Sequence, residues 1–314
     1  MINIEKFKRK DLISIEDMSK EELETILNVS EMIKAKQRNR ELFVPLLGKS
    51  LAMIFRKPST RTRVSFEMAM FQLGGAAMYL SPGEIQMGRS ESVADTAKVL
   101  SRFVNGIMIR TFAHDEVKEL AANASIPVIN GLTDFSHPCQ IIADLFTLKE
   151  KKKALSGLTV AYVGDGNNVC NSWLFAAPKM DINLRVASPK GFEPDSAVVE
   201  KSKAFAAVSK TKVIITNSAE EAVEGADVVY TDVWASMGQE EQAEERKKVF
   251  VPYQINAGLI KKAKPDCLVM HCLPAHRGDE ITDEVMDGAH SVVFDQAENR
   301  LHAQKGILAL LMGR

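Results

Sequence analysis

KSLAMIFRKPST, residues 49–60, begins with a short apolar run and ends in a polar turn, after which apolar side chains recur at helical spacing. Phe66, Met70 and Leu73 fall on one side of the predicted helix, and a second apolar run, Gly75–Leu80, follows it. A strand, a helix and another strand in this order predict a parallel sheet, because parallel strands need a long connection and that connection is usually a helix.

The alternation of strands and helices continues along the chain. In the first half the expected elements are a helix over Ser92–Ser101, a strand over Gly106–Arg110, a helix over Val117–Ala124 and a strand over Ile126–Ile129. After the lysine-rich run Lys149–Lys153, strands are expected at 159–163, 183–187, 212–216, 227–231, 267–270 and 291–294, with helices near 196–208 and over 300–311.

This pattern predicts an α/β protein with two doubly wound domains and mainly parallel sheets. We expect one domain at 1–150 and the other at 151–299, with a C-terminal helix at about 300–314 that packs back on the first. The active site is expected in the interdomain cleft, where the carboxyl ends of strands face each other.

Composition is that of an ordinary globular protein of about two domains, with 314 residues, 46% apolar and 26% charged. The net charge of −1 gives no reason to expect nucleic acid or a membrane as a partner. The start of the chain lacks an apolar signal region, and there is no apolar run of about 18 residues. Four cysteines without a Cys-x-x-Cys pair indicate a reduced, cytoplasmic protein.

Ser59-Thr-Arg-Thr-Arg63 lies where a strand ends and a helix begins. The first N–H groups of a helix have no intrahelical partners, and the helix dipole favours an anion there. Ser59, Thr60 and Thr62 add hydroxyl donors, and Arg61 adds a planar fork suited to phosphate oxygens. The alternative is an ordinary N-cap with solvated arginines, in which Arg63 is a structural ion-pair partner.

The longer stretch FRKPSTRTRVSFE, residues 55–67, resembles the carbamoyl phosphate motif of the aspartate and ornithine carbamoyltransferases. The resemblance implies that Ser59, Thr60, Arg61 and Thr62 bind the phosphate of carbamoyl phosphate. It also implies that Arg110 and Arg300 reach this site, and that Gln86 contributes to it from a neighbouring subunit. The motif identifies the superfamily but not the acceptor. Without the matched context, Arg110 at a strand end would more often be a surface ion-pair partner.

His137-Pro-Cys-Gln140 precedes a predicted helix that starts near Ile141. An imidazole can donate a hydrogen bond to a carbonyl oxygen that becomes negative as an amine attacks, and the Gln140 amide oxygen can accept from the carbamoyl NH2. A histidine before proline is usually structural, but His-Pro-x-Gln matches a motif of the same family.

No metal or cofactor is expected, because the spacing of the histidines and cysteines fits no common structural zinc pattern.

Gly164-Asp-Gly-Asn-Asn168 follows a predicted strand and suggests a dinucleotide fingerprint. That interpretation fails because Val169 replaces the third small residue and no acid ends the next strand. In ornithine carbamoyltransferases a matching stretch meets the amino acid substrate, which implies that Asn168 contacts its α-groups.

Two further segments resemble the acceptor site of ornithine carbamoyltransferases. In TDVWASMGQE, residues 231–240, the resemblance implies that Asp232, Ser236 and Met237 hold ornithine. A site for aspartate would require arginines, and none lies between Asp232 and Glu245. In His271-Cys-Leu-Pro the family places Cys272 beside the δ-nitrogen and the Leu273 carbonyl on the carbamoyl NH2. Leu273–Pro274 is a candidate cis bond. Taken alone, the first segment would be an amphipathic loop with Trp234 and Met237 in a core, and Cys272 would be a small buried hydrophobe.

Together these matches imply transfer of a carbamoyl group from carbamoyl phosphate to the δ-amine of L-ornithine, with Arg110, His137 and Cys272 as the catalytic residues. The family is built on trimers with sites between subunits, so a homo-oligomer is implied. The alternatives are a carbamoyltransferase for another amine, a nucleotide-dependent oxidoreductase, and a non-catalytic phosphate-binding subunit. The last would be expected to have lost one of Arg110, His137, Gln140 and Cys272, and all four are present.

Overall fold

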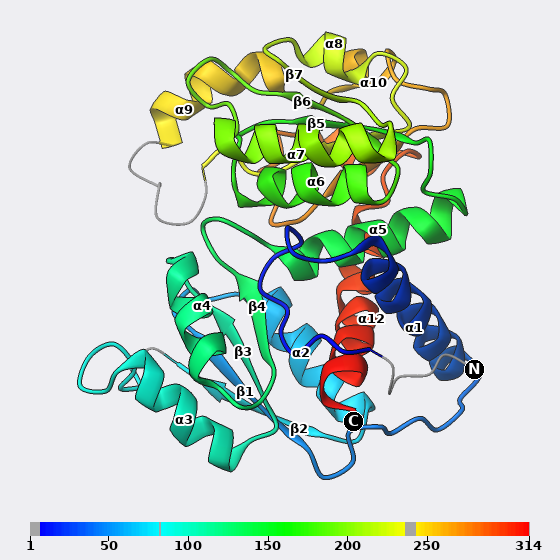
Figure 1. Cartoon of the computed structure of the whole chain (residues 1–314). Coiled ribbons are helices and arrows are strands. Elements are labelled where there is room, and N and C mark those ends of the chain that lie inside the picture. The colour runs from blue at the N-terminus through cyan, green and yellow to red at the C-terminus, as the bar shows by residue number, and fades with distance from the viewer. Residues whose placement is uncertain (1–6, 82, 236–242, 314) are drawn as a thin grey trace. The chain divides into compact units, whose positions relative to one another are not determined.

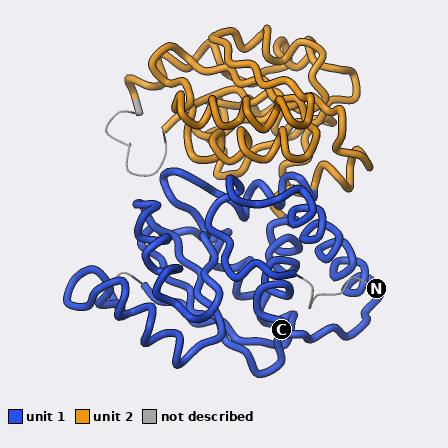
Figure 2. The backbone as a smooth tube through the Cα atoms, in the orientation of Figure 1, with its two compact units in different colours: residues 1–146, 298–314 blue, residues 147–297 orange. Residues whose placement is uncertain are grey.

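The chain forms two compact units, each built around one parallel sheet (Figures 1 and 2). A computed structural model describes residues 7–81, 83–235 and 243–313. Unit 1 consists of Met1–Phe146 and Glu298–Arg314, and unit 2 of Thr147–Ala297. Among the described residues, no helix combines the length and the apolar character needed to cross a bilayer.

The sheet of unit 1 has the strand order β2-β1-β3-β4, with all neighbours parallel. The strands are β1 (Ser50–Phe55), β2 (Ala76–Leu80), β3 (Gly106–Arg110) and β4 (Val128–Leu132). The helices of this part of the chain are α1 (Lys20–Arg38), α2 (Thr60–Gln72), α3 (Val93–Phe103), α4 (His114–Asn123) and α5 (Pro138–Lys152). In Figure 1, α3 and α4 lie on one face of this sheet and α2 on the other, which explains why the central strands β1 and β3 are buried almost throughout.

The sheet of unit 2 has the order β7-β6-β5-β8-β9 and is also fully parallel. Its strands are β5 (Thr159–Val163), β6 (Asn183–Ala187), β7 (Val213–Thr216), β8 (Val228–Thr231) and β9 (Leu268–His271). Its helices are α6 (Asn168–Lys179), α7 (Ser196–Ser209), α8 (Ala219–Val223), α9 (Ala243–Phe250), α10 (Ala257–Ile260) and α11 (Asp283–Met286). A 3-10 turn, η3 (Val251–Tyr253), follows α9, and α12 (Val293–Met312) runs from unit 2 into unit 1.

Both sheets reverse their winding direction at one point, between β1 and β3 in unit 1 and between β5 and β8 in unit 2. In doubly wound sheets, ligands bind outside the carboxyl ends of the strands at such a switch point. Ser59–Thr62 follows β1 and Arg110 ends β3. Gly164–Asn168 follows β5 and Asp232 follows β8. The topology therefore places both groups of predicted site residues at the switch point of their own unit.

The predicted α/β architecture with parallel sheets is confirmed, and most elements agree within a few residues. The strand expected at Ser291–Phe294 is wrong. Ser291 forms only an isolated bridge with Val269, and α12 begins at Val293, seven residues before the expected helix. A four-residue apolar run has no period that distinguishes a strand from the start of a buried helix. The first four residues of the lysine-rich run, 149–152, form the C-terminal end of α5.

Candidate functional site

The phosphate motif of unit 1 forms the N-terminus of α2. Ser59 is the N-cap residue in an extended conformation, and its Oγ accepts the N–H of Thr62 at 3.2 Å. Ser59 Oγ also donates to Thr62 Oγ1 at 3.1 Å. Thr60 is exposed, Arg61 is half-buried and Thr62 is buried. The start of this helix therefore combines backbone N–H groups, hydroxyls and a guanidinium, which is the donor set that a phosphate group needs.

Arg300 joins the phosphate motif to the His-Pro-Cys-Gln motif. Its guanidinium donates to Gln140 Oε1 at 2.6 Å and to Thr62 Oγ1 at 3.3 Å. The Gln140 amide is held from its other side, because Nε2 donates to Asp144 Oδ1 at 2.8 Å. Only 3% of Arg300 is exposed, so these bonds form in a poorly solvated environment where hydrogen bonds to charged groups are strong.

The positive charges of three arginines of unit 1 act on the ring of His137. Burial lowers the pKa of His137 well below 6.5, and the positive charges of Arg300, Arg110 and Arg61 lower it further. The ring is therefore neutral at physiological pH and can donate one N–H without carrying a charge. Cys139 is not available to a ligand, because its buried thiol donates to the carbonyl of Asn130 and burial raises its pKa to about 12.

Arg110 is 6% exposed and is paired in the sheet register with Phe55, the last residue of β1.

Gln86 does not join Arg110 and the residues of the phosphate motif. Its side chain is exposed, and no hydrogen bond within the described part of the chain connects it to residues 59–62. The neighbouring loop is anchored by Arg56, which donates to the carbonyl of Met87 at 2.9 Å.

The other cations of the phosphate motif have their own counterions. Lys57 is buried, forms an ion pair with Asp134 and lies 4.1 Å above the centre of the Phe112 ring. Arg63 forms an exposed ion pair with Glu67 at 3.0 Å. The charges of Lys57 and Arg63 are thus balanced by Asp134 and Glu67.

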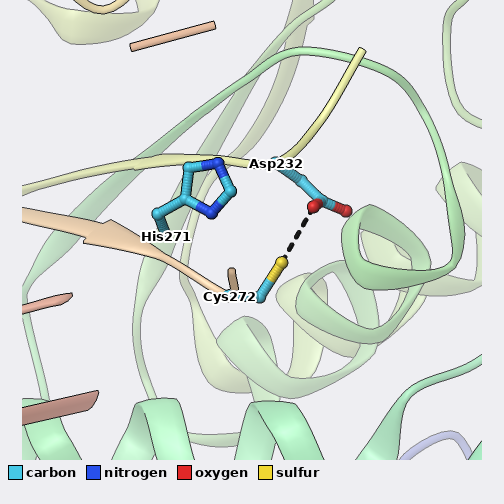
Figure 3. Close-up of side chains that lie close together, drawn as sticks. All are labelled: Asp232, His271 and Cys272. Carbon is cyan, nitrogen blue, oxygen red and sulfur yellow. Dashed lines mark hydrogen bonds between the residues drawn. The ribbon is translucent and has the colours of Figure 1, made fainter. Parts of the chain in front are cut away.

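In unit 2 the carboxylate of Asp232 is held from both sides. Cys272 Sγ donates to Asp232 Oδ1 at 2.8 Å (Figure 3). From the other side, Asn167 Nδ2 donates to Asp232 Oδ2 at 2.8 Å. Asp232 is 6% exposed, and Cys272 is partly exposed at the end of β9. Asn168 is the first residue of α6 and is half-buried. A buried carboxylate beside a thiol can bind an ammonium group of an amino acid.

Arg246 is the first arginine after Asp232 in the sequence, and it is bound to other partners. Its Nη1 donates to Asp165 Oδ2 at 3.0 Å and to the carbonyl of Trp234 at 2.9 Å. Arg246 and Asp165 are both about nine-tenths buried. Asp165 thus balances this positive charge, and Arg246 is paired with Asp165 and not with Asp232.

The segment after β9 is organised by His271. The backbone N–H of Leu273 donates to His271 Nδ1 at 2.8 Å, so the ring proton lies on Nε2, which donates to Glu280 Oε1 at 3.0 Å. Leu273 has a positive φ of 61°, and the predicted cis bond Leu273–Pro274 is confirmed. Burial of both His271 and Glu280 fixes the direction of this turn.

Asp232, His271 and Cys272 each place one possible ligand atom within 4.8 Å of the others (Figure 3). A metal ion held by all three would have to displace a hydrogen bond, because the Leu273 N–H and the Glu280 carboxylate already face the two ring nitrogens of His271. The hydrogen bonds of the ring therefore favour an organic ligand at Asp232 and Cys272 over a metal ion.

Gly166 explains why the segment after β5 resembles a dinucleotide fingerprint. A Cβ atom at Gly166 would lie 2.3 Å from the backbone nitrogen of Pro194. The glycine is thus required by close backbone packing and not by the approach of a pyrophosphate group.

Two of the predicted ornithine-binding residues, Ser236 and Met237, lie outside the described residues. Asn167, Arg246 and Asp144 are further residues of these sites that the sequence motifs do not identify. A signal existed for Asn167, since asparagine between a strand and a helix is a typical N-cap. Nothing local identifies Arg246 or Asp144, because their partners depend on tertiary contacts.

Two domains of one protein family match the chain. "Aspartate/ornithine carbamoyltransferase, carbamoyl-P binding domain" matches residues 10–150, and "Aspartate/ornithine carbamoyltransferase, Asp/Orn binding domain" matches residues 156–311. The chain belongs to the aspartate/ornithine carbamoyltransferase family. The first domain of this family contains the Ser59–Thr62 motif and His137, and the second contains Asp232 and Cys272.

Named relatives within the aspartate/ornithine carbamoyltransferase family are similar over nearly the whole chain. The ornithine carbamoyltransferase of Anoxybacillus flavithermus is 56% identical over 305 residues, which are 97% of each chain. The structure of ornithine carbamoyltransferase from Pyrococcus furiosus is 54% identical, has a TM-score of 0.95 and shares 97% of each chain. That from Gloeobacter violaceus is 47% identical, with a TM-score of 0.87 over 97% of this chain and 99% of its own.

Proposed function

We infer that this chain is a transferase that moves the carbamoyl group of carbamoyl phosphate to the δ-amine of L-ornithine, giving L-citrulline and phosphate. The observation that carries the acceptor assignment is the buried Asp232 carboxylate, which is held by Asn167 and Cys272 while Arg246 is paired with Asp165. This arrangement offers a negative charge to an ammonium group, whereas an acidic acceptor would need the opposite charge. The ornithine carbamoyltransferases that share more than half of its residues support the same substrate.

The donor half of the site binds carbamoyl phosphate through unit 1. Ser59, Thr60, Arg61 and Arg110 hold the phosphate, and Arg300 fixes the phosphate motif relative to Gln140. Thr62, Arg110 and His137 donate to the carbonyl oxygen. Because burial keeps His137 neutral, it stabilises the developing oxyanion as a hydrogen-bond donor. Gln140 and the Leu273 carbonyl bind the carbamoyl NH2 group.

The reaction needs no covalent enzyme intermediate. The δ-ammonium of ornithine loses one proton, and the neutral nitrogen attacks the carbonyl carbon. The new C–N bond forms as the bond between the carbonyl carbon and the phosphate oxygen breaks. The attacking nitrogen gives up its second proton, and the leaving group departs with that proton as hydrogen phosphate. Cys272 and Asp232 orient the amino acid, and Asn168, Ser236 and Met237 complete the ornithine site. Carbamoyl phosphate binds first, since its charge and shape complete the acceptor site.

The active protein is a trimer, or a multiple of trimers, with sites shared between subunits. Support comes from Gln86, which is exposed and has no described hydrogen bond to the phosphate motif of its own chain. An exposed apolar stripe on α2, formed by Val64, Met68 and Phe71, also favours contact with another copy. A cytoplasmic location is supported by the four free cysteines.

Mixing two inactive variants tests the shared site. Gln86→Ala and Cys272→Ala proteins are each nearly inactive, and dissociation and reassociation of the mixture is expected to restore activity that neither parent has. Restoration occurs only if a hybrid contains a site with intact residues from both chains. A mixture that stays inactive although hybrids form would show that each chain builds its own site.

The acceptor assignment is tested by citrulline formation from carbamoyl phosphate with ornithine, putrescine, N-acetylornithine or aspartate as the only acceptor. Turnover with ornithine alone is expected. Turnover with a different amine would keep the donor half of the proposal and overturn the acceptor half. Lack of turnover with every amine, in folded protein that binds carbamoyl phosphate, would indicate a binding subunit.

A further inference from the structure

Asn167 has a defined orientation, because its amide oxygen is occupied by helix α6. Asn167 is the N-cap residue of α6, and its Oδ1 accepts the backbone N–H groups of Val169 at 2.9 Å and Cys170 at 3.1 Å. The hydroxyl of Tyr162, on the adjacent strand β5, donates to the same oxygen at 3.1 Å. With the oxygen facing these three donors, the NH2 group of Asn167 must point away from the helix.

The NH2 group of Asn167 meets Asp232. Asn167 Nδ2 donates to Asp232 Oδ2 at 2.8 Å. The other carboxylate oxygen, Oδ1, accepts from Cys272 Sγ and from the backbone N–H of Val233, each at 2.8 Å. Each oxygen of Asp232 thus has its own donors, and the plane of the carboxylate is fixed by residues on three different segments of unit 2.

The chemical nature of the donor matters for a cationic substrate. An amide can orient a carboxylate without cancelling its charge, whereas a lysine or arginine in the same place would neutralise it. Among the described residues of unit 2, Arg246 is the buried lysine or arginine, and it is paired with Asp165. The contact with Asn167 therefore leaves the full negative charge of Asp232 available.

We propose that Asn167 is a positioning residue for ornithine binding, which acts by holding Asp232 in the orientation that receives an ammonium group of the substrate. The proposal rests on the function inferred above. It assigns different tasks to the two adjacent asparagines: Asn168 contacts the substrate, whereas Asn167 orients Asp232 and caps helix α6.

A serine at position 167 allows the two roles of the side chain, the cap of α6 and the hydrogen bond to Asp232, to be tested separately. Serine is as good an N-cap as asparagine, so Asn167→Ser keeps α6 capped but removes the donor to Asp232. Loss of a hydrogen bond to a charged group is expected to raise KM for ornithine by about 10- to 100-fold. KM for carbamoyl phosphate is expected to change by less than about twofold, because the donor site is built from other residues.

Asn256→Ser is the matched control. Asn256 is the N-cap of α10, and its Oδ1 accepts the N–H of Leu259 at 3.0 Å. The same chemical change at this cap is expected to leave both KM values unchanged. A control variant that shifts KM for ornithine as much as Asn167→Ser would assign the effect to helix capping and overturn the proposal.

A double-mutant cycle with Asp232→Asn decides whether Asn167 acts through Asp232. If it does, Asn167→Ser adds little to the loss of kcat/KM for ornithine already caused by Asp232→Asn. Full additivity of the two losses would overturn the proposal. Failure of the parent protein to carbamoylate ornithine would reject the inferred function, whereas normal parent activity with an unaffected Asn167→Ser variant would reject only the role of Asn167.

Discussion

Arg300 donates a hydrogen bond of 2.6 Å to the amide oxygen of Gln140, although 160 positions separate the two residues in the chain. The same guanidinium contacts Thr62, the buried threonine of the phosphate motif. Two motifs that are distant in sequence thus depend on one planar side chain for their relative placement in unit 1. Arginine suits this task because its fork donates in two directions at once.

Replacement of Arg300 by lysine is expected to raise KM for carbamoyl phosphate by about 10- to 100-fold, because a single ammonium cannot reproduce both contacts. Initial rates at varied carbamoyl phosphate and saturating ornithine measure the effect. Arg63→Lys provides the control: it changes the same residue type within the motif, but Arg63 is exposed and paired with Glu67. Equal KM values for the two variants would contradict the role of Arg300.

His137→Ala is expected to lower kcat by about 10²- to 10³-fold, which is the usual cost of removing one donor to an oxyanion. KM for carbamoyl phosphate should change much less, because the phosphate contacts stay in place. Thermal unfolding of the variant checks that this buried position still packs. A variant that is folded and keeps more than about a tenth of kcat would show that His137 does not touch the reacting carbonyl.

The value of kcat/KM for ornithine is expected to rise with pH from 6.5 to 9. Only the neutral δ-amine attacks, and its pKa resembles that of lysine, about 10.4. His137 adds no inflection in this range, because burial and three arginines lower its pKa well below 6.5 and keep it neutral. Rates at saturating carbamoyl phosphate across this range test the slope. If kcat/KM does not change with pH while the chemical step limits the rate, the δ-amine does not have to lose a proton to solvent before it attacks.

His302 is expected to make the protein less stable in acid. Burial lowers its pKa to about 4, and the charges of Lys305 and Lys34 add to this effect, while Glu298, 3.1 Å away, opposes it. Between pH 6.5 and 4 the unfolded chain binds a proton that the folded chain does not, so the free energy of unfolding falls as the pH falls. The loss amounts to at most about 3 kcal/mol.

Denaturant unfolding of the parent protein and of His302→Gln at several pH values measures this contribution. The variant is expected to lose less stability than the parent between pH 6.5 and 4, and the two should differ by a constant amount above pH 7. Parallel curves throughout would mean that His302 has the same pKa in the folded and unfolded states.

The sequence predicted the elements whose ends carry the chemistry, because strand and helix periods are local and each motif stands at a boundary between them. Ser59 was identified as the start of a helix from its neighbours alone, and it is the N-cap of α2. Arg110 was expected at the end of a strand, and β3 ends there. Contacts between distant segments could not be predicted from the sequence in the same way. The bond between Asn167 and Asp232 joins residues 65 positions apart, and its donor could be recognised only after the cap geometry was known.

The pairing of Arg246 with Asp165 shows a second reason why sequence was insufficient. The sequence between Asp232 and Glu245 contains no arginine, which argues against an acidic substrate, but Arg246 is the next residue. What separates a structural arginine from a substrate-binding one here is its partner, and that partner is 81 positions away. The net charge of a site depends on which charged side chains are paired with each other, so it cannot be determined by counting the charged residues of one segment.

Unit 1 is discontinuous, since Glu298–Arg314 completes a unit whose other residues all precede position 147. During synthesis the ribosome therefore makes all of unit 2 before unit 1 receives its last helix. Until then Thr62 and Gln140 lack Arg300, and the buried Lys34 lacks Asn299. A nascent chain that already contains the whole phosphate motif is thus unable to assemble the donor site, and a premature stop codon before residue 298 removes this site together with part of the core that supports it.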